Sequence, residues 1–115
     1  MKLFNKKEAP LIQNAGGAII TKSIYEGKSK LKWLFREEGA NPADCGWRAI
    51  GDTDTQEYID NPKNLVIVDF NTLANIEPAV LAVYDMPIGT DLTFHFDESG
   101  RYFTDSNTGS RIKMY

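Results

Sequence analysis

The sequence WLFREEGANPADCGWR, residues 33–48, joins two short aromatic segments through a polar turn and says most about the fold. Glycine, asparagine and proline near its middle are typical of a turn between strands. Because an antiparallel pair of strands meets at its connecting loop, the charged residues here are expected at one rim of a sheet. The aromatic residues would anchor that rim, and Arg36 and Arg48 would brace the loop by pairing with Asp44 or Glu37. Its charged residues are Arg36, Glu37, Glu38, Asp44 and Arg48.

Alternating side chains around this turn predict the two strands. Leu31, Trp33 and Phe35 alternate with polar residues, which indicates a half-buried antiparallel strand with these three on one face. Leu34 breaks the alternation. Residues 46–51 predict a short returning strand. Both tryptophans of the chain are expected to be core anchors.

Three further segments have strand patterns. Residues 18–23 are rich in β-branched side chains and follow a glycine pair, which predicts a strand. The continuous apolar run at residues 65–70 predicts a central strand buried on both faces. Apolar residues alternate through 92–97, a turn follows, and residues 101–104 return. This last pattern predicts a hairpin.

Short helices are expected between these strands. Thr53 or Asp54 would cap the first, which ends before the Asn-Pro pair at residues 61–62. A second would cover residues 71–76, capped by the asparagine at its start. A third would cover residues 78–84, because proline fits the first turn of a helix.

Length and composition indicate one globular domain over residues 1–115. The hydrophobic fraction of 42% and the charged fraction of 25% are ordinary for such a domain. The expected class is α+β, with a small, mostly antiparallel twisted sheet of about five or six strands and two or three short helices. Residues 1–15 are interpreted as an N-terminal arm, and residues 105–115 as a second hairpin or a loose tail.

Charge and cysteine content exclude several classes of protein. The net charge of −3 argues against a nucleic-acid binder, which needs a basic surface to release phosphate counterions. No window approaches the roughly 18 apolar residues of a membrane span, and the charged N-terminus does not resemble a signal peptide. A single cysteine forms no internal disulfide. A cytoplasmic protein without membrane or nucleic-acid partners is expected.

Cysteine catalysis is an alternative that the sequence permits. Cys45 and His95 would be nucleophile and base, with Asp97 or Asp44 orienting the histidine. Against this, His95 falls on the polar face of the predicted hairpin, and no oxyanion-hole motif accompanies Cys45. The hypothesis requires the imidazole within hydrogen-bonding reach of the sulfur.

Other reactive motifs are incomplete. Residues 27–29, Gly-Lys-Ser, lack the glycine five positions earlier that a phosphate-binding loop needs. Residues 52–60 are acidic but lack the internal glycine and the ligand order of a calcium loop. One cysteine and one histidine do not make the usual structural zinc site. Adjacent carboxylates suggest acid–base chemistry, but a charge run is usually a solvated edge. The expected protein is therefore no enzyme and holds no metal or cofactor.

The order of short motifs resembles a family of small bacterial domains of unknown function, classed among the immunity proteins of polymorphic toxin systems. The similarity extends over about residues 16–96, and its specific part is the Arg-Glu-Glu strand end followed by Asp-x-Gly-Trp-Arg. The family more often has serine where this chain has Cys45. The resemblance implies a non-enzymatic inhibitor that binds a toxin. The matching motifs are Gly16-Gly17-Ala18-Ile19-Ile20-Thr21-Lys22, Trp33-Leu34-Phe35-Arg36-Glu37-Glu38, Asp44-Cys45-Gly46-Trp47-Arg48, Gly51-Asp52, Glu57-Tyr58, Asn61-Pro62, Asn75-Ile76-Glu77-Pro78 and Pro87-Ile88-Gly89-Thr90.

Two surfaces are expected to meet such a protein partner: the charged rim and the acidic segment at residues 52–60. Electrostatic complementarity there would accelerate association and select the partner. The alternative is a domain that binds a small molecule in a pocket near residues 44–48. The residues expected to contact the partner are Arg36, Glu37, Glu38, Asp44, Trp47, Arg48, Asp52, Asp54, Glu57 and Asp60.

Overall fold

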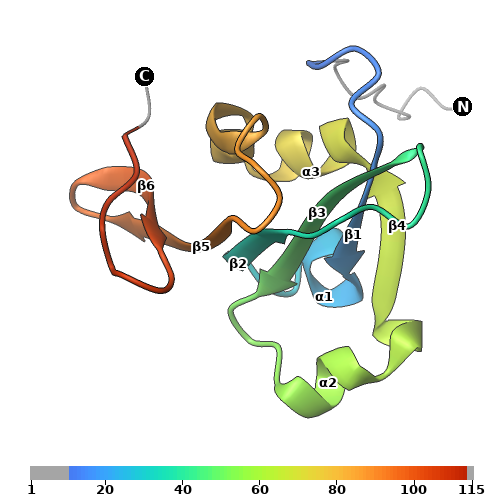
Figure 1. Ribbon diagram of the computed structural model, residues 1–115. Coiled ribbons are helices and arrows are strands. Elements are labelled where there is room, and N and C mark those ends of the chain that lie inside the picture. The colour runs from blue at the N-terminus through green and yellow to red at the C-terminus, as the bar shows by residue number, and fades with distance from the viewer. Residues whose placement is uncertain (1–10, 114–115) are drawn as a thin grey trace, which may run out of the picture.

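The structure is a computed structural model that describes residues 11–113 (Figure 1). These residues form one six-stranded sheet in the order β4-β1-β3-β2-β5-β6, in which the β1–β3 pair is parallel and the other pairs are antiparallel. The strands are β1 (Gly17–Thr21), β2 (Leu31–Arg36), β3 (Asp44–Gly51), β4 (Leu65–Asp69), β5 (Asp91–Asp97) and β6 (Gly100–Asp105). The helices are α1 (Lys22–Tyr25), α2 (Gln56–Asp60) and α3 (Phe70–Ile76), with 3-10 turns η2 (Pro62–Asn64) and η3 (Pro78–Val83). The predicted α+β class with a mostly antiparallel sheet is confirmed.

One face of the sheet, the covered face, packs against α3 and η3. Side chains from the central strands and from these helices share one buried cluster, and Trp47 is 0% exposed within it. Phe70 contacts Tyr84 edge-to-face, with ring centroids 4.7 Å apart. Burial of this apolar surface is the main stabilising term of such a fold. The cluster includes Ala18, Ile20, Leu34, Trp47, Ala49, Phe70, Leu73, Ala74, Val80, Val83, Leu92 and Phe103.

The prediction that Leu31, Trp33 and Phe35 share one face of β2 is wrong in part. Pairing with β3 is irregular between Leu31 and Trp33, so strict alternation fails at this point. Leu34 is fully buried on the covered face, whereas Trp33 is 38% exposed on the other face. Of the two tryptophans expected to anchor the core, Trp47 alone does so.

β4 is an edge strand and not the central strand predicted from its apolar run. Its neighbour in the sheet is β1, with Ile67 opposite Ile19. Val66 and Val68 pack against the core, but Ile67 is 80% exposed. An unbroken apolar run fits a strand covered on both faces, yet α3 covers only one face of β4. The outward isoleucine is therefore left in solvent.

Helix starts differ from the predictions by one or two residues. Thr55 caps α2 by accepting a hydrogen bond from Tyr58 N, and the Asn-Pro pair after the helix ends it as expected. Asp69, not Asn71, caps α3. Asn71 is instead buried, and its amide binds both the N–H and the carbonyl of Ile12. The segment expected as a strand over residues 18–23 leaves the sheet after Thr21 and forms α1.

The C-terminal hairpin of β5 and β6 forms as predicted, with Phe94 opposite Phe103 (Figure 1, orange to red). The following residues turn back on β6, because Gly109 N donates to Asp105 O at 2.7 Å and Ile112 N to Phe103 O at 2.8 Å. Through residue 113 this segment therefore runs back along β6 as a short return. Residues 1–10 of the predicted N-terminal arm lie outside the described part. Within residues 11–113, no helix is long and apolar enough to cross a membrane.

Candidate functional site

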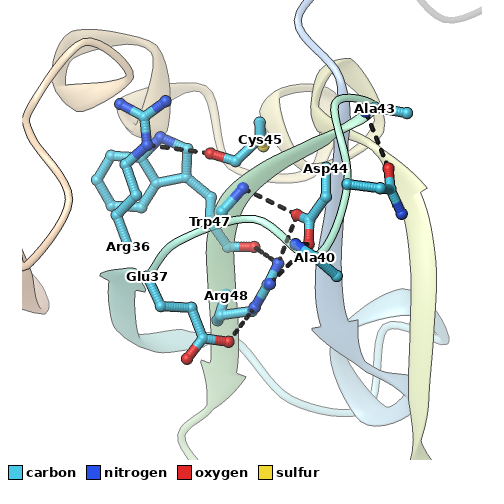
Figure 2. Close-up of polar contacts among 10 residues, drawn as sticks. Arg36, Glu37, Ala40, Ala43, Asp44, Cys45, Trp47 and Arg48 are labelled. Atoms are coloured by element: carbon cyan, nitrogen blue, oxygen red, sulfur yellow. Dashed lines mark hydrogen bonds and ion pairs between the residues drawn. The ribbon is translucent and has the colours of Figure 1, made fainter.

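Arg48 is the centre of the charged rim where β2 and β3 meet their connecting loop (Figure 2). Its guanidinium donates two parallel hydrogen bonds to Asp44, at 2.9 Å to Oδ1 and 2.8 Å to Oδ2. Its Nε donates to Glu37 Oε2 at 2.7 Å. The Arg48 side chain is 9% exposed, whereas that of Glu37 is 57% exposed. The ion pair is thus nearly buried and ends in a carboxylate that faces solvent.

Asp44 also binds the backbone of the loop. Its oxygens accept hydrogen bonds from Gly46 N at 2.8 Å and Ala40 N at 2.9 Å. The hydrogen bonds from Arg48, aided by these backbone donors, hold the pKa of the Asp44 carboxyl far below its usual range. The same pairing raises the pKa of the Arg48 guanidinium. Both groups are therefore charged at neutral pH.

Two glycines permit the close approach of the loop to β3. Gly46 has φ +88°, and a Cβ there would collide with the carbonyl oxygen of Glu37. A Cβ on Gly39 would collide with the carbonyl oxygen of Asp44. Any side chain at either position would push the loop off the strand and separate the rim carboxylates from Arg48.

Arg36 does not pair with the rim carboxylates, although the sequence suggested this as one brace of the loop. Its Nε donates to Cys45 O at 3.0 Å and its Nη1 to Met86 O at 2.8 Å, and its guanidinium lies 5.6 Å from the centroid of the Trp47 ring. Trp47 Nε1 donates to Tyr84 O at 3.0 Å. Arg36 and Trp47 therefore attach the segment after η3 to the rim. Arg36 is half-buried and Trp47 is buried, so both stabilise the fold.

The acidic segment divides into inward and outward carboxylates. Asp54 accepts hydrogen bonds from Ser23 Oγ at 2.5 Å and Gly51 N at 2.6 Å, so it fixes the turn before α2. Asp52 accepts from Lys30 N at 3.0 Å. Glu57 and Asp60 are exposed on α2, where Asp60 binds the Gln56 amide at 2.7 Å. The charge that a partner would meet here comes mainly from α2.

The second face of the sheet, the open face, was missed by the sequence reasoning. Residues paired across neighbouring strands share a face, and the pairs Ile67–Ile19, Ile19–Arg48, Arg48–Phe35 and Ile50–Trp33 define this one. Where α2 approaches this face, it leaves a hollow of about 260 Å³. The hollow is lined by Ile19, Phe35, Glu37, Arg48, Ala49, Ile50, Gln56, Ile59, Asp60 and Leu65.

Residues 18–106, which include nearly the whole sheet, match the family model described as Immunity protein Imm33 domain. The chain belongs to the Imm33 immunity-protein family. No curated protein and no solved structure shows a significant match to the sequence. Imm33 membership agrees with the resemblance to immunity proteins, a family that in general implies a protein partner.

Cys45 and His95 of this Imm33 protein do not form a catalytic pair. His95 Nε2 contacts Thr104 Oγ1 at 2.9 Å, and its ring stacks on Tyr102. Strand register places His95 beside the start of β2, whereas Cys45 lies beyond the end of β2. At about 3.3 Å per residue along a strand, His95 and Cys45 are about 20 Å apart. Burial raises the pKa of the Cys45 thiol, which disfavours the nucleophilic thiolate. Residues 11–113 contain no group of three or more His, Cys, Asp or Glu that could hold a metal ion.

The predicted contact residues of the Imm33 protein thus fall into two groups. Arg36, Trp47, Arg48, Asp44 and Asp54 are buried or half-buried and hold the rim and the turn before α2 in place. The exposed group, which a partner can reach without any rearrangement, is Glu37, Glu38, Asp52, Glu57 and Asp60.

Proposed function

We propose that this Imm33 protein neutralises a cognate bacterial toxin by binding it in the cytoplasm and occluding it, without catalysis. Membership of the immunity-protein family carries the proposal. The toxin is the protein partner, and neither a nucleic acid nor a membrane takes part.

The contact surface we propose combines the open face with the exposed carboxylates around it. Ile67 and Trp33 supply accessible apolar area, while Glu37, Glu38 and α2 supply negative charge. A standard interface of roughly 1,600 Å² with a few anchoring residues is sufficient for tight binding. Since Arg48 and Asp44 fix Glu37 in advance, the toxin meets a preorganised carboxylate, and less conformational entropy is lost on binding.

Titration of toxin activity against this protein tests the proposal. The probe is a purified toxin domain, to be sought among the products of the genes that neighbour this one. Occlusion predicts that inhibition is complete near one molecule of this protein per molecule of toxin, and that the two co-elute. A catalytic antidote would instead protect at substoichiometric amounts. Full toxin activity in the presence of excess protein would refute the proposal.

The alternative of a small-molecule-binding domain makes a different prediction. The hollow beside Arg48, at about 260 Å³, lies below the roughly 300–1,000 Å³ typical of sites that enclose a ligand. A metabolite that raises the melting temperature by several degrees, and loses this effect when Ile50 is replaced by aspartate, would favour the alternative.

A further inference from the structure

We propose that the hollow between α2 and the open face receives a basic side chain, lysine or arginine, from the protein partner. The inference rests on the proposed function, because the partner is the toxin, and it specifies which kind of residue anchors the toxin. It depends on three features of the hollow: its walls, its charge and its size.

The walls of the hollow are apolar. Ile19 and Ile50 form its base on the sheet, Phe35 and Leu65 bound it on either side, and Ile59 faces it from α2. All five are half-buried, so each still exposes carbon surface to water. A side chain inserted here would remove this surface from solvent, which favours binding.

The mouth of the hollow carries excess negative charge. Arg48 is its one cation within residues 11–113, and Asp44 already neutralises it through two hydrogen bonds. Glu37 gives Arg48 one oxygen, Oε2, while its other oxygen has no partner among the described residues. Asp60 is exposed and binds the neutral Gln56. Two carboxylates, Glu37 and Asp60, thus line the hollow beside a guanidinium that Asp44 already neutralises, and both can bind a further cation.

Apolar walls together with two carboxylates, Glu37 and Asp60, match the chemistry of lysine and arginine. Both have a hydrocarbon stem that packs on apolar surface and a charged head that stays at the polar edge. An acidic side chain would be repelled by Glu37 and Asp60, and an aliphatic one would partly desolvate both carboxylates without adding a donor. The volume of about 260 Å³ suits one large side chain better than a metabolite.

The inference can be tested on the free protein by nuclear magnetic resonance. The probes are N-acetyl-arginine-N-methylamide and the citrulline compound, which has the same shape but no charge. We expect the arginine compound to shift the backbone amide signals of Ile19, Ile50 and Ile59, and the citrulline compound to shift them much less. Equal shifts with both probes, or shifts elsewhere on the protein, would overturn the inference.

A matched pair of variants locates the binding charge. Asp60→Asn removes a carboxylate at the hollow, whereas Glu57→Gln removes one from the same helix away from it. Both residues are exposed, so both variants should keep the native fold. Asp60→Asn should weaken arginine binding by about three- to tenfold, the effect of losing a partly screened charge-assisted contact. An equal effect of Glu57→Gln would refute a specific site.

The toxin complex separates this inference from the proposed function. Asp60→Asn should accelerate dissociation of the complex, whereas Glu57→Gln should leave the dissociation rate unchanged. If the protein inhibits the toxin at one-to-one stoichiometry but Asp60→Asn and Glu57→Gln dissociate at equal rates, the basic anchor in the hollow is refuted and the proposed function stands. Specific arginine binding by a protein that inhibits no toxin would support the cation site and refute the function.

Discussion

The covered and open faces of the sheet are built from the same strands but meet different surroundings. On β2 and β3, Leu34 and Trp47 point to the covered face and are excluded from water, whereas Trp33 on the open face is 38% exposed. Antiparallel sheets with one solvated face usually place polar residues there. Here the solvated face carries isoleucines and aromatic residues. Exposed apolar area of this kind is typical of interaction surfaces, and for this reason we propose the open face as the contact surface, while the covered face stabilises the fold.

Replacing each tryptophan by alanine should give the largest difference in unfolding free energy between the two faces. Trp47→Ala removes a fully buried indole and its hydrogen bond to Tyr84 O, so we expect a loss of about 3–5 kcal/mol in the free energy of unfolding. Trp33→Ala, its counterpart on the open face, should cost less, about 1–2 kcal/mol, because part of its indole stays in water. Urea unfolding of both variants measures this. Similar losses for the two would contradict the division between the faces.

Removing the charge of Asp44 should have the next largest effect. Asp44→Asn leaves Arg48 nearly buried with the exposed Glu37 as its remaining ion-pair partner, at a cost of about 2–4 kcal/mol in unfolding free energy. The wild-type protein should also be stabilised by this carboxylate above its unfolded pKa of about 3.9. Since the folded pKa is depressed, that stability falls as pH drops from about 5 toward the folded value.

Unfolding curves between pH 3 and pH 7 provide the measurement, and Asp60→Asn is the control because its carboxylate is exposed. The wild type should lose more stability on acidification than Asp44→Asn does. Parallel pH profiles for these two proteins would show that the rim pairing does not stabilise the fold.

Replacing Ile67 should affect binding more than stability. Its side chain is 80% exposed on the edge strand, so Ile67→Asp should change the unfolding free energy by no more than about 1 kcal/mol. Toxin affinity should fall by roughly tenfold or more if the open face is the interface. Calorimetric titration with the toxin measures the change, and Ile88→Asp, an exposed isoleucine outside the open face, is the control. Equal affinity of the Ile67 variant and the wild type would place the interface elsewhere.

The smallest expected effect concerns association kinetics. Glu57→Lys with Asp60→Lys reverses the charge of α2 and should slow association with a basic toxin by several-fold at low salt, with a shallower salt dependence. Stopped-flow mixing at two ionic strengths measures both quantities. An unchanged association rate would exclude α2 from the approach of the toxin.

Much of the fold was predictable because its signals are local. The turn chemistry of residues 37–43 and the alternation in residues 92–97 predict the two hairpins that form. The expectation that Arg48 would pair with Asp44 or Glu37 also holds, since all three lie next to one loop. Short sequence separation is what made these predictions possible.

The failed predictions depend on contacts between distant segments. Only the register of β2 against β3 shows that Trp33 faces outward, and only the position of β4 beside β1 shows that Ile67 is exposed. Arg36 and Arg48 each end an aromatic segment and look equivalent in sequence. They differ because the segment after η3 presents backbone carbonyls to Arg36. The hollow, too, exists only because α2 approaches the open face.

The rim bonds span short stretches of chain, which affects when this surface is formed. The Arg48 contacts reach back 4 residues to Asp44 and 11 to Glu37. Closing such small loops loses little entropy, so we expect the β2–β3 turn to order before the parallel β1–β3 pairing. Pulse-labelled hydrogen exchange during refolding should then protect Gly46 N earlier than Ile20 N. Under the proposed function, early ordering of the rim would give the protein its charged contact surface before the rest of the sheet is complete.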